Sequence, residues 1–234
     1  MAKREDLRLT RTGTVINVSS QKMETALVQA LQACTIAIQA EFAVTLVHEP
    51  KVHLRDIVNH LQSAYPDVPF NHHFDASFLL PDGGILYVVS NTGEKHVVLI
   101  SEEKRQGTND LRAEEGLAKQ SKGNAIERLG KNVIGFRTWM FTEGIFPFVV
   151  FGQGVDFDKD SSILDRVTTI AMFAPLNTIE VTNLGDEGRF NRGSFFFRSE
   201  PWGVEEMTVN MTEVVRRSLF YYFAKHGDTA FLNS

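Results

Sequence analysis

Hydrophobic positions change between helical and strand-like spacing several times along the chain. Residues 21–46 carry apolar side chains at helical intervals, which predicts a long buried helix. A shorter helix is expected over residues 54–64, because the proline that follows Tyr65 disfavours helical backbone at that point. Residues 212–226 predict a closing helix, with Gly227 as the residue that follows its end.

The middle of the chain predicts a strand–helix–strand unit. The β-rich runs 85–90 and 96–101 enclose a short polar segment, which is typical of a hairpin. Residues 123–141 then carry apolar side chains at alternating intervals of three and four, as in an amphipathic helix. The apolar run 146–151 has the composition of a central strand. Three later runs also look strand-like: 178–183, 194–198 and 207–211.

Together these elements predict an α/β fold with a central mixed β-sheet flanked by helices. No repeat, low-complexity tract or Pro/Gly-rich linker interrupts the sequence. We therefore expect a single domain over residues 1–234, in which residues 1–12 form a flexible N-terminal arm.

Composition limits the class of protein further. The 234 residues are 43% hydrophobic and 23% charged, which excludes collagen-like and disordered chains. The single cysteine, Cys34, cannot form an internal disulfide and fits a reducing cytoplasm. The charged start of the chain has no apolar segment behind it, and no apolar run approaches the ~20 residues of a membrane span. We therefore expect a cytoplasmic protein with no signal peptide and no membrane association.

Charge is distributed unevenly along the chain. The formal net charge is −5, which argues against a protein that coats nucleic acid nonspecifically. Between Glu103 and Arg137, however, eight basic residues stand against five acidic ones, so this stretch is locally basic by three charges. The pattern fits either a cleft that grips a polyanion or a solvated helix face of mixed charge, and charge alone does not separate the two.

Two carboxylates and a lysine meet at the end of the second hairpin strand. Side chains alternate along a strand, so Glu102 and Lys104 point to one face and Glu103 to the other. The hairpin returns Asp82 to the same end. A three- or five-residue loop puts Asp82 on the face of Glu102 and Lys104, whereas a four-residue loop puts it opposite Glu103. Such a group suits Mg²⁺ and the metal-assisted hydrolysis of a phosphodiester. The alternative is a simple turn beside a solvated strand end.

A further motif, Gly-Asn-Ala-Ile-Glu-Arg, begins at Gly123. By itself it is compatible with an ordinary helix start, with Asn124 as the cap and Glu127 completing a capping box. Taken with three other segments in order, however, it resembles the EcoRI-type type II restriction endonucleases of the PD-(D/E)xK superfamily. The matching segments are 81–85, 102–107, 123–128 and 146–151, with a weaker match over 164–168.

The resemblance implies a restriction-endonuclease-like fold, a homodimer and Mg²⁺-dependent cleavage of a short palindrome in double-stranded DNA. By the same resemblance, the products carry 5′-phosphates and 5′ overhangs. Asp82, Glu102 and Lys104 match the catalytic residues of the family. The backbone carbonyl of Glu103 joins Asp82 and Glu102 as an expected metal ligand.

The resemblance also implies which residues contact DNA. Asn124, Ala125 and Arg128 fall on the base-reading segment at a helix N-terminus, and Glu127 is expected to pair with the arginine across the dimer axis. Arg166 matches an arginine that faces the DNA. The match suggests a central AATT, while the residues that would read the outer base pair are replaced, so that pair stays open. The expected DNA-binding residues are Ser121, Lys122, Gly123, Asn124, Ala125, Glu127, Arg128 and Arg166.

Two other functions stay open at this point. One is a catalytically inactive, sequence-specific DNA-binding protein on the same fold, against which the intact acids and lysine argue. The other is a nuclease of the same fold with a duty such as repair, which the match over residues 123–128 disfavours. A restriction enzyme further implies a cognate DNA methyltransferase that acts on the same site, with no stable complex expected.

Overall fold

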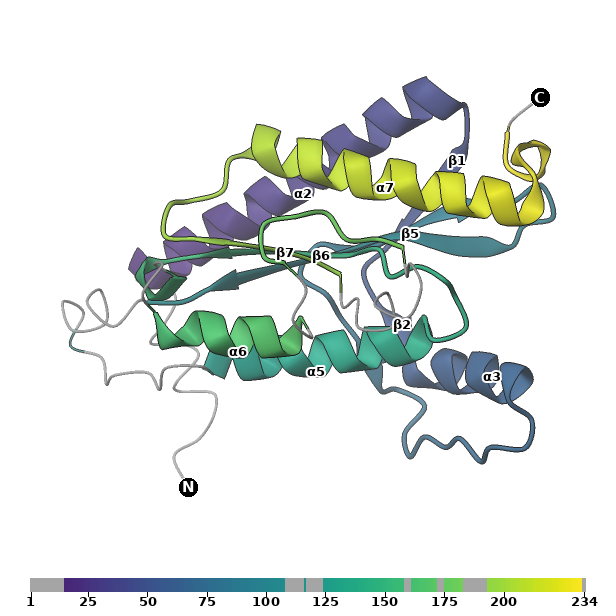
Figure 1. Cartoon of the computed structure of the whole chain (residues 1–234), viewed down its shortest axis with the longest axis horizontal. Helices are drawn as coiled ribbons and strands as arrows, with labels where there is room; N and C mark the ends of the chain where they lie inside the picture. The colour runs from purple at the N-terminus through teal and green to yellow at the C-terminus, as the bar shows by residue number, and fades with distance from the viewer. Residues whose placement is uncertain are drawn as a thin grey trace.

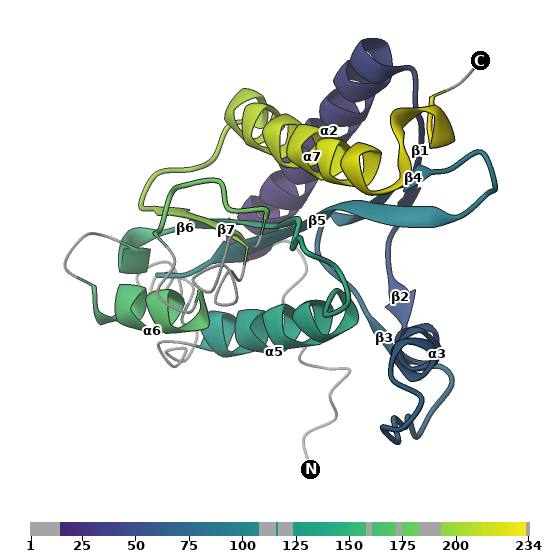
Figure 2. The same cartoon turned by 45° about the vertical axis from the view of Figure 1, so that its right-hand side comes forward.

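Two layers of helices enclose a five-stranded sheet in the computed structural model of the chain (Figure 1, Figure 2). The structure describes residues 15–107, 116, 124–157, 161–171, 175–182 and 193–232. In the helices that begin at residues 15 and 124, side chains are described from residues 21 and 125 onward. The expected N-terminal arm, residues 1–12, lies outside these ranges.

The sheet combines antiparallel and parallel strands. In spatial order its strands are β1 (Thr45–Glu49), β4 (Gly84–Val89), β5 (Lys95–Arg105), β6 (Phe148–Gln153) and β7 (Ser194–Arg198). The pairs β1/β4 and β4/β5 are antiparallel, whereas β6 runs parallel to both β5 and β7. The predicted mixed sheet is therefore confirmed, and β7 coincides with the predicted run 194–198.

Helix α5 (Asn124–Trp139) connects β5 to the parallel strand β6. Every residue of β6 is buried, as expected for a strand that is covered on both faces of the sheet. The apolar side chains of α5 that carry the alternating spacing are buried as well: Ile126, Leu129, Val133 and Phe136. The strand–helix–strand prediction is confirmed, with boundaries that differ by one to four residues from those predicted.

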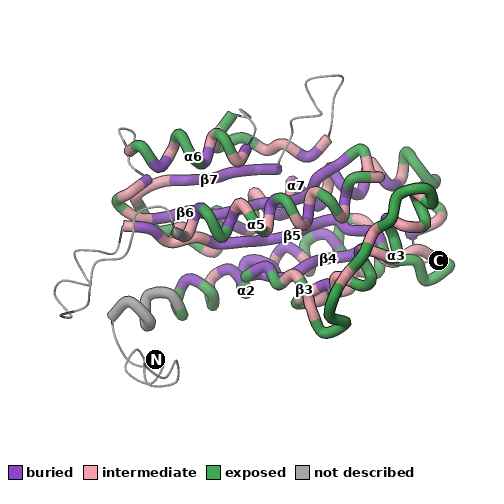
Figure 3. Tube along the Cα trace, turned by 90° about the horizontal axis from the view of Figure 1, so that it is seen from below, coloured by how far each residue is buried: buried purple, intermediate pink, exposed green. Residues whose placement is uncertain are grey.

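The remaining long helices cover both faces of the sheet. Helix α2 (Val15–Phe42) and helix α7 (Val204–His226) lie together on one face, opposite α5 (Figure 1). Helix α6 (Ser162–Ile170), which the sequence did not predict, lies beside α5 (Figure 3). Its start is stabilised by Ser161, whose side chain accepts a hydrogen bond from the Ile163 N–H at 3.3 Å.

A small unit projects from the β4 side of the sheet (Figure 2). In it, strand β2 (Val52–His53) pairs antiparallel with β3 (Phe78–Leu79), next to helix α3 (Leu54–Ala64). The helix predicted over residues 54–64 is thus confirmed. Two short 3₁₀ turns complete the elements: η1 (Val155–Phe157) and η3 (Asp228–Ala230).

The first helix ends earlier than the hydrophobic spacing predicts. Ala43 adopts a φ of 48°, a left-handed conformation that stops α2 after Phe42. Val44 forms an isolated bridge to Leu232, and β1 begins at Thr45. The Ala43 N–H still donates to the Gln39 carbonyl of α2, and from Val44 onward the backbone pairs with Leu232 and then with β4. These tertiary contacts are not contained in the local pattern.

Two of the strand predictions near the C-terminus are wrong. Residues 207–211 lie inside α7, which therefore begins at Val204 rather than at residue 212. Met207 and Met211 are about one helical turn apart and both are buried. The run predicted as a strand is therefore the start of the buried face of a helix. The run 178–183 contributes one isolated bridge, Thr182 to Ile145, and its last residue lies outside the described ranges. The predicted end of the closing helix is confirmed, because Gly227 takes a φ of 86° directly after His226.

Among the described residues, none of the helices combines the length and apolarity that crossing a lipid bilayer demands.

Candidate active site

Asp82 lies in a tight turn that leads into β4. The Gly84 N–H donates to the Pro81 carbonyl at 3.1 Å, and the Gly83 N–H donates to the Ser101 carbonyl of β5 at 2.9 Å. Glycine is required at position 83 by space, since a Cβ atom there would lie 2.2 Å from Ser101 Oγ. The Pro-Asp-Gly-Gly sequence therefore places Asp82 directly against the C-terminal part of β5.

One lysine gathers the oxygens of the predicted catalytic group. Lys104 Nζ donates to Asp82 Oδ2 at 2.6 Å, to the Glu103 carbonyl at 2.7 Å and also to Glu102 Oε1. The Asp82 N–H donates to Glu102 Oε2 at 3.1 Å, and the Glu103 N–H donates to Asp82 Oδ2 at 3.3 Å. The structure thus brings Asp82, Glu102 and Lys104 together, although they come from two separate elements.

Asp82 does not reach Lys104 through the alternation of side chains along a strand. Val89 pairs with Lys95, so the hairpin loop has the five residues that favour the face of Glu102. A β-bulge at Val98 then shifts the register by one, and Gly84 faces Ser101. Extended further, this register would set Asp82 opposite Glu103. Asp82 still reaches Lys104 because it lies in the turn, outside the ladder, where strand alternation does not apply.

The cluster runs from an exposed aspartate, Asp82, to two buried glutamates, and it is rich in acidic groups. Glu102 is only 1% exposed, and burial raises the pKa of its carboxyl above the usual range while the Lys104 ammonium opposes that rise. Burial, together with Asp82 and Glu24, raises the pKa of Glu103 to about 8. For Lys104, burial acts to lower the pKa, but the carboxylates of Glu102 and Asp82 outweigh it and the net shift is upward. One ammonium faces several acidic groups, which is the electrostatic condition that attracts a further cation.

The donor set fits a hard divalent cation. Asp82 Oδ2, Glu102 Oε1 and the Glu103 carbonyl all accept from the Lys104 ammonium. The three oxygens are therefore close enough together to bind one cation. Two carboxylates with one carbonyl form an all-oxygen set of the kind that Mg²⁺ prefers. Among the described residues, no three His, Cys, Asp or Glu side chains converge as a metal-ligand group. Here, however, the third oxygen comes from the backbone, and the Glu103 side chain lies near Glu24 of α2.

The residues expected to contact DNA lie on α5 and α6. Helix α5 begins with Asn124, so this residue is the first of the helix and not the cap before it. Ala125 is half-buried, and Glu127 and Arg128 are exposed in the first turns of the same helix. Arg166 is exposed on α6. The remaining three, Ser121, Lys122 and Gly123, lie outside the described residues.

Two residues near the site escape the sequence analysis. Asn132 of α5 donates from Nδ2 to Glu102 Oε1 at 2.8 Å. His48 of β1 lies with Nε2 3.0 Å from the Gly83 carbonyl and supports the turn that carries Asp82. The sequence does contain a signal for Asn132. It lies three residues after Leu129 and four before Phe136, so it is a polar residue on the apolar face of the helix. The contact of His48 depends on the pairing of β1 with β4 and has no local signal.

Comparisons with known proteins point to one family. The family model described as "Restriction endonuclease EcoRI" matches residues 10–228. The chain is 31% identical over 179 residues to "Type II restriction enzyme RsrI" of Cereibacter sphaeroides, covering 62% of this chain and 64% of that protein. It is 34% identical over 114 residues to "Type II restriction enzyme EcoRI" of Escherichia coli, covering 45% of this chain and 41% of that protein. The matches thus span less than two thirds of the length of either relative.

A mixed sheet lies between helices, and an acid and a lysine of its central strand meet an aspartate from the turn before β4. This arrangement is consistent with the restriction-endonuclease-like fold. The match over residues 10–228 is more specific, and the chain belongs to the EcoRI restriction endonuclease family. The resemblance suggested by the four sequence segments is confirmed.

Proposed function

We propose that this chain is a type II restriction endonuclease, which hydrolyses phosphodiester bonds of double-stranded DNA at a short palindrome with Mg²⁺ as cofactor. The observation that carries the proposal is the convergence of Asp82, Glu102 and Lys104 at the end of β5. Family membership supports it, since both named relatives are called type II restriction enzymes. The presence of both acids and the lysine argues against a catalytically inactive DNA-binding protein.

Each residue of the cluster has a role in the proposed reaction. Asp82, Glu102 and the Glu103 carbonyl would hold Mg²⁺, which lowers the pKa of a bound water and offsets negative charge on a phosphate. The Lys104 ammonium donates to a non-bridging phosphate oxygen and stabilises the charge that builds up there. A bond forms from the water oxygen to phosphorus, and the bond from phosphorus to the 3′ oxygen breaks. The 3′ oxygen leaves as a hydroxyl, and the phosphate stays on the 5′ end.

Sequence recognition is assigned to the start of α5. The free N–H groups of a helix N-terminus favour contact with DNA, and an asparagine side chain can pair with the edge of adenine in the major groove. Asn124, Ala125 and Arg128 are proposed to read a central AATT, with Gly123 allowing close approach. The outer base pair falls to the segment with Ser121 and Lys122. Arg166 on the neighbouring helix is proposed as a further DNA contact, and staggered cuts would leave 5′ overhangs.

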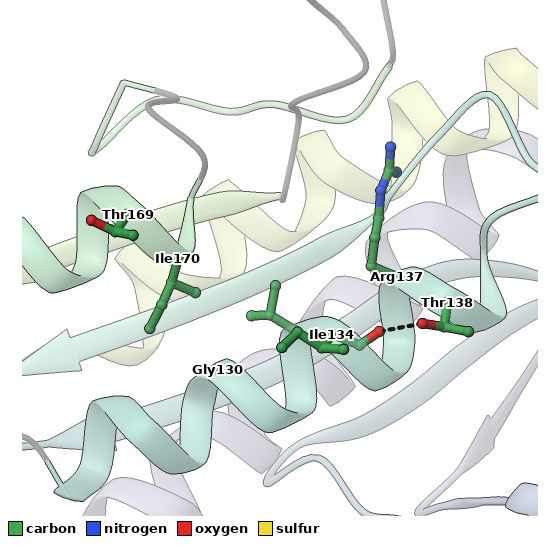
Figure 4. A pocket seen from close by; sticks show the side chains of 7 residues that line it. Gly130, Ile134, Arg137, Thr138, Thr169 and Ile170 are labelled. Atoms are coloured by element: carbon green, nitrogen blue, oxygen red, sulfur yellow. Dashed lines mark hydrogen bonds between the residues drawn. The ribbon is translucent and has the colours of Figure 1, made fainter.

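A homodimer explains how one chain could cut both strands of a palindrome, since a two-fold axis presents the same residues to each half-site. An apolar groove of about 430 Å³ lies between α5 and α6 and supports this proposal. Ile134, which is 70% exposed, and Ile170 line it, together with Arg137 and Thr138 (Figure 4). We propose that a second copy of the chain covers the apolar lining of this groove in the dimer.

The same helix carries a self-complementary pair of charges. Glu127 and Arg128 are both exposed on α5, the helix that presents Ile134. Across a two-fold axis, Glu127 of one copy can face Arg128 of the other, so a second copy of the chain satisfies both the charges and the apolar groove.

The biological setting follows from the proposed reaction. A chain that cuts a short DNA site requires a cognate DNA methyltransferase that protects the same site in the host, without a stable complex between the two proteins. We place both in the cytoplasm, where the DNA lies, and Cys34 is a free, buried cysteine that needs no oxidising compartment.

Digestion of a fully sequenced plasmid tests the proposal. The purified chain is incubated with the plasmid in Mg²⁺ or in EDTA, and the ends of the fragments are sequenced. Discrete, Mg²⁺-dependent fragments with 5′-phosphates that share an AATT centre are expected, and the sequences reveal the outer base pair. Specific retention of duplexes containing AATT without cleavage would instead favour an inactive binder. Cleavage with no shared sequence would favour a repair-type nuclease.

A further inference from the structure

A third donor to the Glu102 carboxylate comes from outside the proposed catalytic group. Glu102 Oε2 accepts the Asp82 N–H at 3.1 Å, while Oε1 accepts from Lys104 and from Asn132 Nδ2, the latter at 2.8 Å. Asp82 and Lys104 belong to the cluster itself. Asn132 belongs to α5, on a different layer of the molecule.

Of the two side chains that donate to Glu102 Oε1, Asn132 has the more rigid support. Its neighbours on the same face of α5, Leu129 and Phe136, are each 0% exposed and anchor the helix to the sheet. The asparagine side chain has two rotatable bonds and is half-buried between these anchors and the strand. Lysine, by contrast, has four rotatable bonds and shares its three donor hydrogens among three acceptors. Asn132 therefore holds Oε1 from the helix, while the Asp82 backbone N–H holds Oε2 from the turn.

We propose that Asn132 is a positioning residue, whose amide fixes the Glu102 carboxylate in the orientation that cation binding and catalysis require. The inference rests on the function proposed above. Asn132 does not touch the phosphate or the cation in this account; it acts through Glu102. It also ties the catalytic carboxylate to the helix that starts at Asn124, eight residues earlier, or about 12 Å along the helix axis.

The variants Asn132→Ala and Asn132→Leu test this role. Leucine has the same branched arrangement of side-chain heavy atoms as asparagine, although it is bulkier, and alanine is smaller. Neither can donate a side-chain hydrogen bond, so a loss that both variants share reports on the amide. Asn210→Ala is the matched control. Asn210 is a half-buried asparagine of α7 whose side chain donates to the Glu206 carbonyl within its own helix.

Two quantities are measured on each variant. The first is the cleavage of a duplex carrying the site found by plasmid digestion, separated into kcat and KM. The second is the affinity for Mn²⁺ without DNA, measured by isothermal titration calorimetry. Residues that orient a metal ligand typically change metal affinity or activity by about 10- to 100-fold when removed. We expect a loss of that size in kcat and in Mn²⁺ affinity, with KM for DNA within about twofold of wild type, whereas Asn210→Ala should match the wild type.

Each outcome bears on the proposal. Unchanged kcat and Mn²⁺ affinity in Asn132→Leu would overturn the positioning role and leave the proposed function intact. A raised KM with normal kcat would overturn it as well, because it would make Asn132 a DNA contact. If the wild type cleaves no DNA but binds Mn²⁺ and the variants bind it about tenfold more weakly, the endonuclease proposal fails and the positioning role stands. A wild type that neither cleaves DNA nor binds Mn²⁺ would overturn both.

Discussion

Replacing Gly83 with alanine should damage both stability and catalysis through one close contact. The added Cβ atom would lie 2.2 Å from Ser101 Oγ and 2.9 Å from Leu27 Cδ2. Gly83 is not among the positions with positive φ, so the backbone itself tolerates a side chain and the cost comes from space. To relieve the clash, the side chains of Ser101 and Leu27 or the turn itself must shift, and a movement of the turn away from β5 displaces Asp82.

The magnitude follows from the packing. Forcing an extra methyl group into a filled interior costs about 1–3 kcal/mol, which in a chain of this size lowers the melting temperature by roughly 2–4 °C per kcal/mol. A shift of about 1 Å in a reacting group can cost about 100-fold in rate. We therefore expect Gly83→Ala to melt several degrees below the wild type and to lose cleavage activity by about that factor, measured by calorimetry and by single-turnover cleavage.

Ser101→Ala provides the matched background. The Ser101 hydroxyl is buried and makes no hydrogen bond in the structure, so removing it should be neutral or slightly stabilising. In that background, the methyl group of Gly83→Ala can occupy the space that the hydroxyl leaves. The double variant should recover at least half of the lost stability. An equal cost of Gly83→Ala with and without the Ser101 hydroxyl would refute the steric explanation.

Three further predictions concern specificity, pH and assembly. Asn124→Ala should reduce cleavage at the cognate site far more than nonspecific DNA binding; equal losses, measured by cleavage and gel shift, would count against its role in reading the sequence. Burial lowers the pKa of His96 in the fold despite nearby Glu94, while the unfolded side chain keeps its usual pKa of 6.5. The free energy of unfolding should therefore fall as the pH drops below 6.5, and urea titrations should show a shallower fall in His96→Phe. Ile134→Glu should shift the sedimentation coefficient from dimer to monomer, and an unchanged dimer would place the interface elsewhere.

The sequence predicts the elements that local spacing determines. The helix over residues 54–64 and the unit formed by β5, α5 and β6 follow from their own apolar periodicity. The helix prediction for residues 43–46 and the strand prediction for residues 207–211 are wrong. A few apolar residues fit both helical and strand spacing, and only the elements they pack against decide between the two. The helix stops at Ala43, after which Val44 forms a bridge and Thr45 begins β1. Met207, in contrast, belongs to a buried helical stripe that only the docked helix reveals.

The site shows the same division between local and tertiary information. The spacing of Glu102 and Lys104 places both on one face of a strand, and the structure has them bonded to each other. The register expected from the length of the hairpin loop does not extend to Asp82, because the bulge at Val98 changes the register without any sequence signal. Asp82 converges on Lys104 through the turn instead. Asn132 could not be assigned a partner, because its contact depends on how α5 lies across the sheet.

The catalytic role of Lys104 is tested by comparing the wild type with Lys104→Ala on one duplex that contains the cognate site. Single-turnover cleavage in Mg²⁺ and DNA binding in Ca²⁺ are measured for both, with Lys95→Ala as a control, since Lys95 is a partly exposed lysine at the other end of β5 that pairs with Glu49. Loss of a charge-stabilising donor typically costs about 100- to 1,000-fold in rate. Lys104→Ala should lose at least that much cleavage while binding the duplex as a dimer with near wild-type affinity, and Lys95→Ala should cut normally. Cleavage by Lys104→Ala at the wild-type rate would contradict the proposal that Asp82, Glu102 and Lys104 form the active site.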